Sequence, residues 1–594
     1  MSPATSNSGF VTPFTSSPSS IFSIFDHIRL KALLVDVIIY YSLFRFFKWL
    51  LSPYVSRSSR RYRFKDIPGP PTQSWFKGNL GQLFNAKGLP FHQFLVDRFG
   101  GMVKVYGFFG DEQLYISDPH ALQSVIVKDQ DAFEETKVFT DNNRIIFGPG
   151  LVSTTGDVHK KQRKIVTPVF SVPQLKRVTP IVYDIAEKLA DVLSREVQKA
   201  SVTVSAPIGK REKAYNGKNG KGVLDMSEWM SRVALETIGR TVLGYSFDPL
   251  DSPHNNPYTS AIKELIPTLF SLSVLRQFAP FLTRLGPAWL RRKLVERIPN
   301  RAIQKVKDMS DIMDRTAKSI LREKRESGVG VEGEEKDLIS VLLRANERAA
   351  AGEQLSESEL TGQMTVLIFG AQDTTSSALS RILYLLSTNR EIQDKVREEV
   401  VNAFADQDRL EYETISELPW LDAVIKETLR LYPPVPFVRR TATKERTLMY
   451  SSTNSDVADS SVTVPVGTTL FVGIAGANRL ESVWGPDAKM WKPERWMSDK
   501  SPALIRLPGI YYGMLSFFGG GRSCIGYKFA QIEMKIILAT LLRRFKFSPT
   551  QEEIIWNLSQ IISPSVRRPS ASVTDECGFI EEKGLPMVVE LMTE

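Results

Sequence analysis

The sequence predicts a mainly α-helical globule with a small β-sheet region, preceded by an N-terminal membrane anchor. Three observations lead to this fold class. Apolar residues recur at helical spacing over most of the chain, and the clearest segments are 181–197, 224–243, 357–386 and 528–545. Patterns that indicate strands are confined to short stretches at 103–106, 113–116 and 469–472. Hydrophobic residues make up 42% of the 594 positions, so the chain can bury a large core.

The N-terminal residues divide into a polar tail and an apolar segment. Residues 1–32 begin with a Ser/Thr/Pro-rich stretch and are predicted to be a disordered tail. Residues 33–51 are long enough for a membrane anchor helix, but they include Asp36, Arg45 and Lys48. An interfacial helix with snorkelling cations and a buried core helix are the alternatives. No small-residue cleavage site follows in the sequence, so we expect the anchor to be retained.

Residues 52–71 are predicted to be a basic and proline-rich linker. The basic run 57–65 would hold this side of the anchor in the cytosol or against anionic headgroups. The sequence IPGPP at 67–71 disfavours helix and sheet and forms a stiff elbow. Residues 72–594 have no boundary of similar strength, and their hydrophilic stretches are predicted to be loops within one domain, at 206–222, 327–335 and 450–461.

Composition excludes several kinds of site. The two cysteines, Cys524 and Cys577, are too few for a disulfide framework, a four-cysteine zinc site or a four-cysteine iron–sulfur cluster. Any metal bound through sulfur is therefore bound by one sulfur. Cys577 has no glycine turn or helix start beside it and is interpreted as structural or incidental. The net charge of +10 is spread along the chain without a nucleic-acid motif, so we expect no nucleic-acid partner.

The loop FFGGGRSCIG carries the strongest local signal for chemistry. Glycines 519–521 let the backbone pass close to a neighbouring group, and Cys524 then lies at the start of an apolar-periodic helix. Free N–H groups and the helix dipole stabilise a thiolate at such a position. Arg522 suits an acidic group on the same ligand, and Phe517 can shield the sulfur. A buried structural cysteine in a glycine turn is the alternative.

The spacing of the whole loop resembles the haem-binding signature of the cytochrome P450 family. The matching positions are Phe517, Gly520, Arg522, Cys524 and Gly526. This resemblance implies that haem b is the cofactor and that Cys524 is the axial thiolate ligand of its iron, whose electron density favours O–O cleavage. It also implies that Gly526 lets the next helix pack near the macrocycle.

A second motif lies in the middle of the longest predicted helix, which begins with a capping box at 356–359. Asp373 and Thr374 interrupt its apolar face, and the Thr374 hydroxyl can bond back to the carbonyl of Gly370. A solvent-facing polar stripe is the alternative. The stretch resembles the oxygen-activation segment of the family, which implies that Asp373 and Thr374 deliver protons to bound dioxygen. Ala371 departs from the glycine that the family usually has there.

A third motif, ETLR, places Glu427 and Arg430 three residues apart on a helix that ends at two prolines. A surface ion pair is the alternative reading of these two residues. The motif resembles the ExxR motif of the family, and PERW at 493–496 supplies Arg495. The resemblance implies a buried charge cluster that holds the haem-binding core.

Three basic residues resemble the group that binds the haem propionates in the family. His159 and Arg163 lie in the helical sequence GDVHKKQRKIV, where His159 stands in place of the more usual tryptophan. Arg440 follows PPVPFVR and is the third candidate. The adjacent Arg439 is the alternative candidate for this propionate-binding role.

The resemblance implies a monooxygenase that inserts one oxygen atom of O2 into a C–H or C=C bond of a lipophilic small molecule. Only 70 residues follow Cys524, so we expect electrons from NADPH through a separate membrane-bound cytochrome P450 reductase, with cytochrome b5 as a further partner. Lys528 and Lys535 are candidates for a basic docking surface, with a solvated helix as the alternative. The expected location is the endoplasmic reticulum membrane, with the catalytic domain on the cytosolic side.

Aromatic and aliphatic residues dominate the predicted substrate pocket and favour a lipophilic substrate. Its candidate residues are Phe139, Ile146, Phe147, Phe369, Ala371, Val435 and Phe437, together with the apolar helices at 265–281. Each of them can equally be core packing. The serine-rich start and the long insertions resemble filamentous-fungal members, which favours a terpenoid or another secondary metabolite.

Two classes of function remain as alternatives to this reading. One is a different monooxygenase substrate, either a fatty acid or a xenobiotic. The other is a haem-thiolate isomerase or dehydratase that does not use O2, or a non-enzymatic haem protein. These last proteins do not need the acid and alcohol that Asp373 and Thr374 supply.

Overall fold

A computed structural model describes residues 64–202, 221–251, 257–326, 337–451, 459–498, 502–569 and 579–592, together with Val37, Tyr40, Tyr41, Phe44 and Arg45. The chain divides into two units, residues 1–61 and 62–594. Within the described residues, no helix combines the length and the apolar character needed to cross a bilayer. The predicted tail, most of the predicted anchor, linker and loops, and Cys577 lie outside the described residues and stay predictions.

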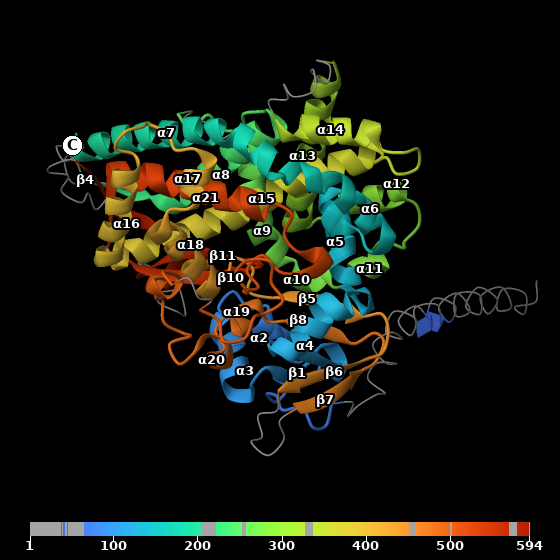
Figure 1. Cartoon of the computed structure of the whole chain (residues 1–594). Helices are drawn as coiled ribbons and strands as arrows, with labels where there is room; N and C mark the ends of the chain where they lie inside the picture. Colours follow the sequence, from blue (N-terminus) through green and yellow to red (C-terminus); the bar gives the residue numbers. More distant parts are fainter. Residues whose placement is uncertain are drawn as a thin grey trace, which may run out of the picture. The chain divides into compact units, whose positions relative to one another are not determined.

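The longest helix of the second unit, α15 (Glu357–Thr388), lies in the middle of its helical part (Figure 1). Its 32 residues span about 48 Å at the α-helical rise. The predicted capping box is confirmed, because the Ser356 hydroxyl accepts from the N–H of Glu359 at 3.3 Å and the Glu359 carboxylate accepts from the N–H of Ser356 at 2.9 Å. The helix packs most extensively against α8 (Met226–Ile238).

The two halves of α15 belong to different hydrophobic cores. Its first half contributes Leu360, Met364, Val366 and Ile368 to one cluster. Its second half contributes Ala378, Leu379, Ile382, Leu383 and Leu386 to a second cluster. The polar segment 372–377 lies between them, so both ends of the helix are fixed by packing on either side of Asp373 and Thr374.

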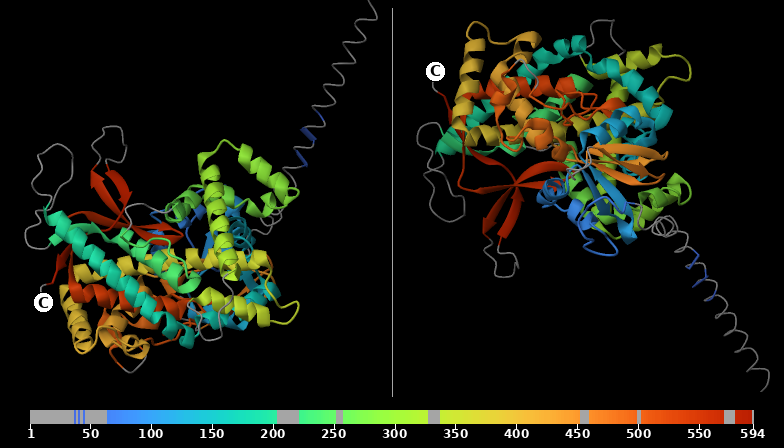
Figure 2. Two further views of the ribbon diagram at one scale, coloured as in Figure 1. Left: turned by 90° about the horizontal axis from the view of Figure 1, so that it is seen from above. Right: turned by 60° about the horizontal axis from the view of Figure 1, so that its bottom comes forward.

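The other predicted helical segments are confirmed. Segment 181–197 lies within α7 (Val172–Val202). Residues 226–243 of segment 224–243 form α8 and the π-helical turn Gly239–Leu243, while Leu224 and Asp225 end the strand β4 (Lys221–Asp225). Segment 528–545 forms α21 (Tyr527–Arg544), with β9 beginning at Phe545. In Figure 2, α7 lies beside the C-terminal strands coloured red, one of which contacts it. The helical part also includes α13 (Arg301–Glu326), α14 (Leu338–Arg348), α16 (Arg390–Ala403) and α18 (Pro419–Leu431).

The main sheet has five strands in the order β1, β2, β8, β5, β3. The three predicted strand segments are confirmed as parts of β1 (Met102–Tyr106), β2 (Glu112–Ile116) and β8 (Thr469–Val472). β2 and β8 pair in parallel, and the other neighbours pair antiparallel, with β5 (Val438–Ala442) between β8 and β3 (Phe133–Glu135). The sheet therefore joins strands from the first part of the chain to strands that follow α18.

Eight further strands form three smaller sheets, and the sequence patterns did not predict them. One sheet orders β10 (Glu553–Ser559), β11 (Ile561–Pro569) and β12 (Phe579–Lys583). Gln560 makes the turn between β10 and β11 with a positive φ of 73°. The others contain β4 (Lys221–Asp225), β13 (Pro586–Leu591) and β9 (Phe545–Pro549), and the pair β6 (Arg446–Ser451) and β7 (Asp459–Val464).

Candidate active site

The glycines of the cysteine loop are required by close approach to the chain itself. A Cβ on Gly519 would lie 1.7 Å from the carbonyl oxygen of Pro508, and one on Gly520 would lie 2.1 Å from that of Ile126. Gly520 also has a positive φ of 58°, which favours glycine. The turn Gly520–Arg522 then places Cys524, whose N–H donates to the carbonyl of Phe517 at 2.9 Å.

Cys524 is exposed on one side and surrounded by protein on the others. Its side chain is accessible, yet burial raises the pKa of its thiol above the usual value. A backbone hydrogen bond from Gly526 and the charge of Arg163 act in the opposite direction. Gly526 is the N-cap of α21, so Cys524 lies two residues before the cap. At this position burial affects the pKa of the thiol more than the helix terminus does. A bound metal ion would deprotonate such a thiol.

A cationic cavity of about 360 Å³ lies beside the loop, and the predicted propionate-binding residues converge on it. His159 and Arg163 come from α6 (Gly156–Val166), Arg440 from β5 and Arg522 from the cysteine loop. Burial and the charges of the three arginines lower the pKa of His159 to about 3. The histidine is therefore neutral at physiological pH and can donate or accept a hydrogen bond. Arg439 does not line this cavity, which removes the ambiguity with Arg440.

The arginines of the cavity are held by hydrogen bonds on their outer sides. Arg163 donates to the carbonyl and hydroxyl oxygens of Ser523 at 2.8 and 2.9 Å. Arg522 pairs with Glu134 at 2.9 Å and Arg440 pairs with Glu135 at 2.8 Å. Both glutamates lie on β3, whose role the sequence reasoning missed because nothing in the local pattern of β3 indicates partners more than 300 residues away.

Asp373 and Thr374 lie at the midpoint of α15, next to an open position. The predicted back-bond is present, since the Thr374 hydroxyl donates to the carbonyl of Gly370 at 2.7 Å. A Cβ on Gly370 would meet no heavy atom within 4 Å, although the helix is packed on both sides of this turn. Burial raises the pKa of Asp373 to about 6, while the charge of Lys583 lowers it. This carboxyl can therefore hold or release a proton close to neutral pH.

The predicted charge cluster is buried, so the alternative of a surface ion pair is excluded. Arg430 donates to both carboxylate oxygens of Glu427 at 2.8 Å, and neither side chain has exposed surface. Arg495 contacts the same carboxylate at 3.4 Å, and the indole N–H of Trp496 donates to it at 3.0 Å. The sequence reasoning named Arg495 but missed Trp496, the next residue of the same PERW motif.

The cluster is connected to the cysteine loop through Asn478, another residue that was missed. Arg430 donates to the carbonyl of Asn478 at 2.8 Å. The Asn478 side chain accepts from the N–H of Leu515 at 2.9 Å and donates to the Ser516 hydroxyl at 3.0 Å. Leu515 and Ser516 begin the segment that leads to Cys524, so the buried cluster fixes the start of the loop.

The predicted substrate-pocket residues separate into two groups. Phe147 and Phe369 pack with ring centroids 4.7 Å apart, and Ile146 and Ala371 lie in the same hydrophobic cluster. Phe437 instead stacks on His92 at 4.6 Å, within an aromatic core beside the main sheet. Phe139 is 37% exposed, and Val435 is half-buried. The structure thus brings only part of the predicted set together against α15.

The proposed role of Lys535 as a surface residue is wrong. Its side chain is 3% exposed and pairs with Asp422 at 2.8 Å, and it also donates to the carbonyl of Ser416. It cannot contact a partner protein from this position. Lys528, with its ammonium 5.9 Å from the ring of Tyr527, is half-buried and stays a candidate.

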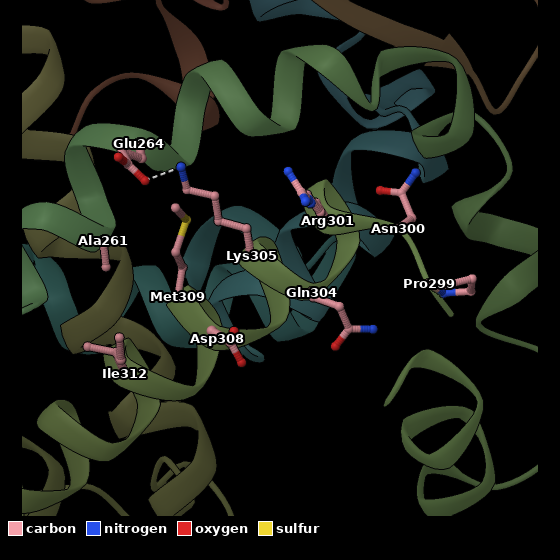
Figure 3. Close-up of a pocket in the computed structure, with 10 residues that line it drawn as sticks. All are labelled: Ala261, Glu264, Pro299, Asn300, Arg301, Gln304, Lys305, Asp308, Met309 and Ile312. Atoms are coloured by element: carbon pink, nitrogen blue, oxygen red, sulfur yellow. Dashed lines mark ion pairs between the residues drawn. The ribbon is translucent and has the colours of Figure 1, made fainter. Parts of the chain in front are cut away.

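A larger cavity of about 620 Å³ lies between α9 (Pro257–Ser271) and α13, and Figure 3 shows its lining. Lys305 of α13 forms an ion pair with Glu264 of α9 across it. No residue of this cavity comes from α15 or the cysteine loop, and its lining carries several charged side chains. It is therefore separate from the group around Cys524.

The residues present fit a haem group. The sulfur of Cys524 is accessible, and a Cβ at position 370 would meet no heavy atom within 4 Å, while one at position 526 would meet the Phe170 ring at 3.9 Å. One neutral histidine and three arginines meet at a cavity beside the cysteine loop and suit two carboxylates. Cys524 would hold the iron, and the cationic group would hold the propionates.

Comparison with known proteins agrees with this chemistry. The family described as Cytochrome P450 matches residues 68–568. A cytochrome P450 monooxygenase of Postia placenta is 39% identical over 531 residues, covering 87% of this chain and 94% of the relative. A ganoderic acid synthetase of Ganoderma lucidum is 34% identical, with 85% and 92% covered, and a monooxygenase of Hericium erinaceus is 31% identical, with 87% and 94% covered. The chain belongs to the cytochrome P450 family and is a monooxygenase.

Proposed function

We propose that the protein oxidises a lipophilic terpenoid, inserting one oxygen atom of O2 by hydroxylation or epoxidation. The observation that carries the reaction type is the Asp373–Thr374 pair, which lies half-buried at the midpoint of α15 beside the open position at Gly370. The aromatic contact of Phe147 with Phe369 supports an apolar substrate. The name of the Ganoderma relative, a ganoderic acid synthetase, supports a terpenoid skeleton.

The haem group, when bound, supplies the redox chemistry of dioxygen. The protein's own residues supply protons and orientation. The Thr374 hydroxyl donates a hydrogen bond to the carbonyl of Gly370, which positions its oxygen, and it would turn its hydrogen away from this carbonyl to pass a proton to the site. Asp373, with a pKa of about 6, can replace a proton that the hydroxyl passes on. The buried cluster around Glu427 keeps the cysteine loop in position while this occurs.

Electrons reach the site from NADPH through a separate cytochrome P450 reductase, and cytochrome b5 is a second electron donor. The protein works at the endoplasmic reticulum membrane with residues 72–594 on the cytosolic side. The apolar segment 33–51 and the basic run 57–65 that follows it support this location. Lys528 contributes to the surface that the reductase contacts.

The first experiment is a carbon monoxide difference spectrum of the reduced protein in microsomes, followed by titration with terpenoids, fatty acids and xenobiotics. A strongly red-shifted Soret band and a spin-state shift with a terpenoid support the proposal. A spin-state shift with fatty acids or xenobiotics but not with terpenoids would show that the substrate belongs to one of those classes instead. Substrate conversion without O2 or NADPH consumption would contradict the monooxygenase reaction and indicate an isomerase or dehydratase.

A further inference from the structure

Two arginines near the substrate-pocket residues have no acidic partner. Arg276 ends the short helix α10 (Ser273–Arg276), and Arg439 lies on β5 (Figure 1). Both side chains are only half-exposed. Among the residues that the structure describes, no carboxylate forms an ion pair with either guanidinium group. The contacts of the two guanidinium groups include the amides of Asn142, Gln277 and Gln560 and the ring of Phe84.

Side-chain amides provide the hydrogen bonds of these arginines. Arg276 donates from Nε to Asn142 Oδ1 at 3.2 Å and from Nη1 and Nη2 to the amide oxygen of Gln560 at 3.1 and 3.2 Å, with that oxygen turned toward the guanidinium. Arg439 donates from Nη1 to Gln277 Oε1 at 3.4 Å. Amides satisfy N–H donors but do not neutralise a positive charge. Hydrogen bonds therefore hold the two guanidinium groups in place, but no negative charge compensates their positive charge.

This arrangement is unfavourable for the folded protein on its own. Burial lowers the pKa of both arginines to about 10, and the charge of Arg276 further lowers that of Arg439. Glu135 is the acid that acts on Arg439, but it is already paired with Arg440 at 2.8 Å. Two desolvated cations that repel each other destabilise the fold. A ligand that supplies negative charge would reverse this effect.

The position of the pair connects it to the substrate-pocket residues. Asn142 lies on α5 (Lys137–Phe147), whose last residue packs its ring on Phe369 of α15. Asn142 also binds the backbone carbonyl of Arg276 at 2.9 Å. The hairpin that carries Gln560 packs against α15 on its β11 side, where the Ser377 hydroxyl donates to a β11 carbonyl at 2.6 Å. The helix that carries Asn142 and the hairpin that carries Gln560 are therefore both in contact with the helix that carries Thr374.

We propose that Arg276 and Arg439 bind a carboxylate of the substrate, which is therefore an amphipathic acid oxidised at its apolar end. This inference rests on the proposed monooxygenase function. Guanidinium groups present parallel N–H donors that match a carboxylate. The contact of Phe147 with Phe369 joins α5, which supports Arg276, to α15, which carries Thr374. An acid held at the arginines would therefore place its apolar part, a terpenoid skeleton or a long fatty-acid chain, against these aromatic residues.

The test is titration of the haem-loaded, full-length protein with matched acids and methyl esters. The probes are oleanolic acid, abietic acid and palmitic acid, each with its methyl ester. Binding is followed by the spin-state shift and, independently of the haem, by calorimetry. We expect a skeleton that fits to bind about 10- to 100-fold more tightly as the acid than as the ester, because charge-assisted hydrogen bonds are lost in the ester. The skeleton that binds best separates a terpenoid acid from a fatty acid.

Variants then assign the preference to the arginine pair. Arg276→Met and Arg439→Met should each remove most of the preference for the acid, and Arg439→Lys should restore part of it. Arg144→Met is the matched control, since Arg144 is an exposed arginine on α5 and its loss changes the net charge equally. The control should keep the full preference for the acid.

Two results would overturn the proposal. One is equal binding of acid and ester to the wild type, or a preference for the acid that persists in both Met variants. The other result comes from thermal unfolding without a ligand. We expect the double variant Arg276→Met/Arg439→Met to unfold at the same temperature as the wild type or at a higher one. A lower unfolding temperature would show that the two arginines stabilise the fold and would contradict the proposal. Loss of the red-shifted Soret band would contradict the proposed function, whereas the calorimetric comparison of acid and ester would remain valid.

Discussion

Glu427 and Arg430 lie one turn apart on α18, have no exposed surface and are joined by two hydrogen bonds of 2.8 Å. Removing one partner would leave a buried charge without compensation. We expect Glu427→Gln or Arg430→Leu to destabilise the protein by about 3–5 kcal/mol. Thermal unfolding and haem content measure the effect. Arg568→Leu, which breaks an exposed pair with Glu582, should change stability by less than about 1 kcal/mol.

Replacing Cys524 tests the iron ligand. Cys524 is the only cysteine of the described residues, so Cys524→Ala leaves that part of the chain without a sulfur ligand of this type. We expect the red-shifted Soret band of the reduced carbon monoxide complex to disappear. Cys577→Ala is the control and should keep the band. A band that survives in Cys524→Ala would disprove the ligand assignment.

Thr374→Ala tests the proton relay. The variant should bind haem normally but form less product per NADPH consumed, with the difference released as hydrogen peroxide, because the hydroxyl that passes protons is missing. Thr374→Ser should restore coupling. Thr365→Ala is a close control, since Thr365 lies on the same helix and also donates to the carbonyl four residues earlier, at 3.0 Å. Equal coupling in wild type and Thr374→Ala would contradict the relay.

The pKa of Asp373 predicts a pH dependence of turnover. Burial raises this pKa to about 6, so the acid carries its proton below pH 6 and loses it above. If the protonated acid is the donor, coupled product formation should fall as the pH rises through about 6. Asp373→Asn should be slower by roughly 100-fold and should lack this inflection. An unchanged inflection in the variant would assign the titration to another group.

Glu533 on α21 predicts a pH dependence of stability. Its side chain is fully buried, and the hydroxyls of Thr375 and Thr237 are polar neighbours whose interactions only partly offset the effect of burial. Burial raises its pKa well above the usual value, so the folded state binds a proton that the unfolded state releases above about pH 4.3. The free energy of unfolding should therefore fall as the pH rises from there toward the folded-state pKa.

Glu533→Gln removes this titration and isolates its contribution. The variant should be more stable than the wild type at pH 8 and nearly equal to it at pH 4, as measured by thermal unfolding. Glu581→Gln, at a partly exposed position on β12, is the control and should leave the pH dependence unchanged. A parallel decline of wild type and Glu533→Gln would show that another group titrates.

Local signals were sufficient to predict the parts of the site that lie on continuous segments. The capping box of α15, the back-bond of Thr374 and the turn before Cys524 depend on residues within a few positions of one another. Helix periodicity and turn chemistry act over that range, so the sequence contains the information. The pairing of Glu427 with Arg430 also depends on residues a few positions apart. Their burial, however, could be expected only from the resemblance to the ExxR motif.

The contacts that were missed or wrong depend on distant parts of the chain. Glu134 and Glu135 meet arginines that lie more than 300 residues away, and Asn478 joins two segments that share no local pattern. Lys535 was assigned to the surface because lysine is usually exposed, but Asp422 offers it a buried partner. Eight strands outside the main sheet escaped detection because their pairing is set by packing rather than by propensity.

The adjacent arginines of β5 have a consequence for insertions and deletions. Successive side chains of a strand point to opposite faces, so Arg440 reaches the cationic cavity while Arg439 reaches Gln277. The pairing of Arg440 with Leu470 and of Arg439 with Phe471 fixes which arginine takes which side. A single residue gained or lost between α18 and β5 would exchange the two faces. The protein should therefore tolerate the insertion or deletion of two residues in this connection but not of one residue. A one-residue change would disturb the site even though every side chain of the site would still be present.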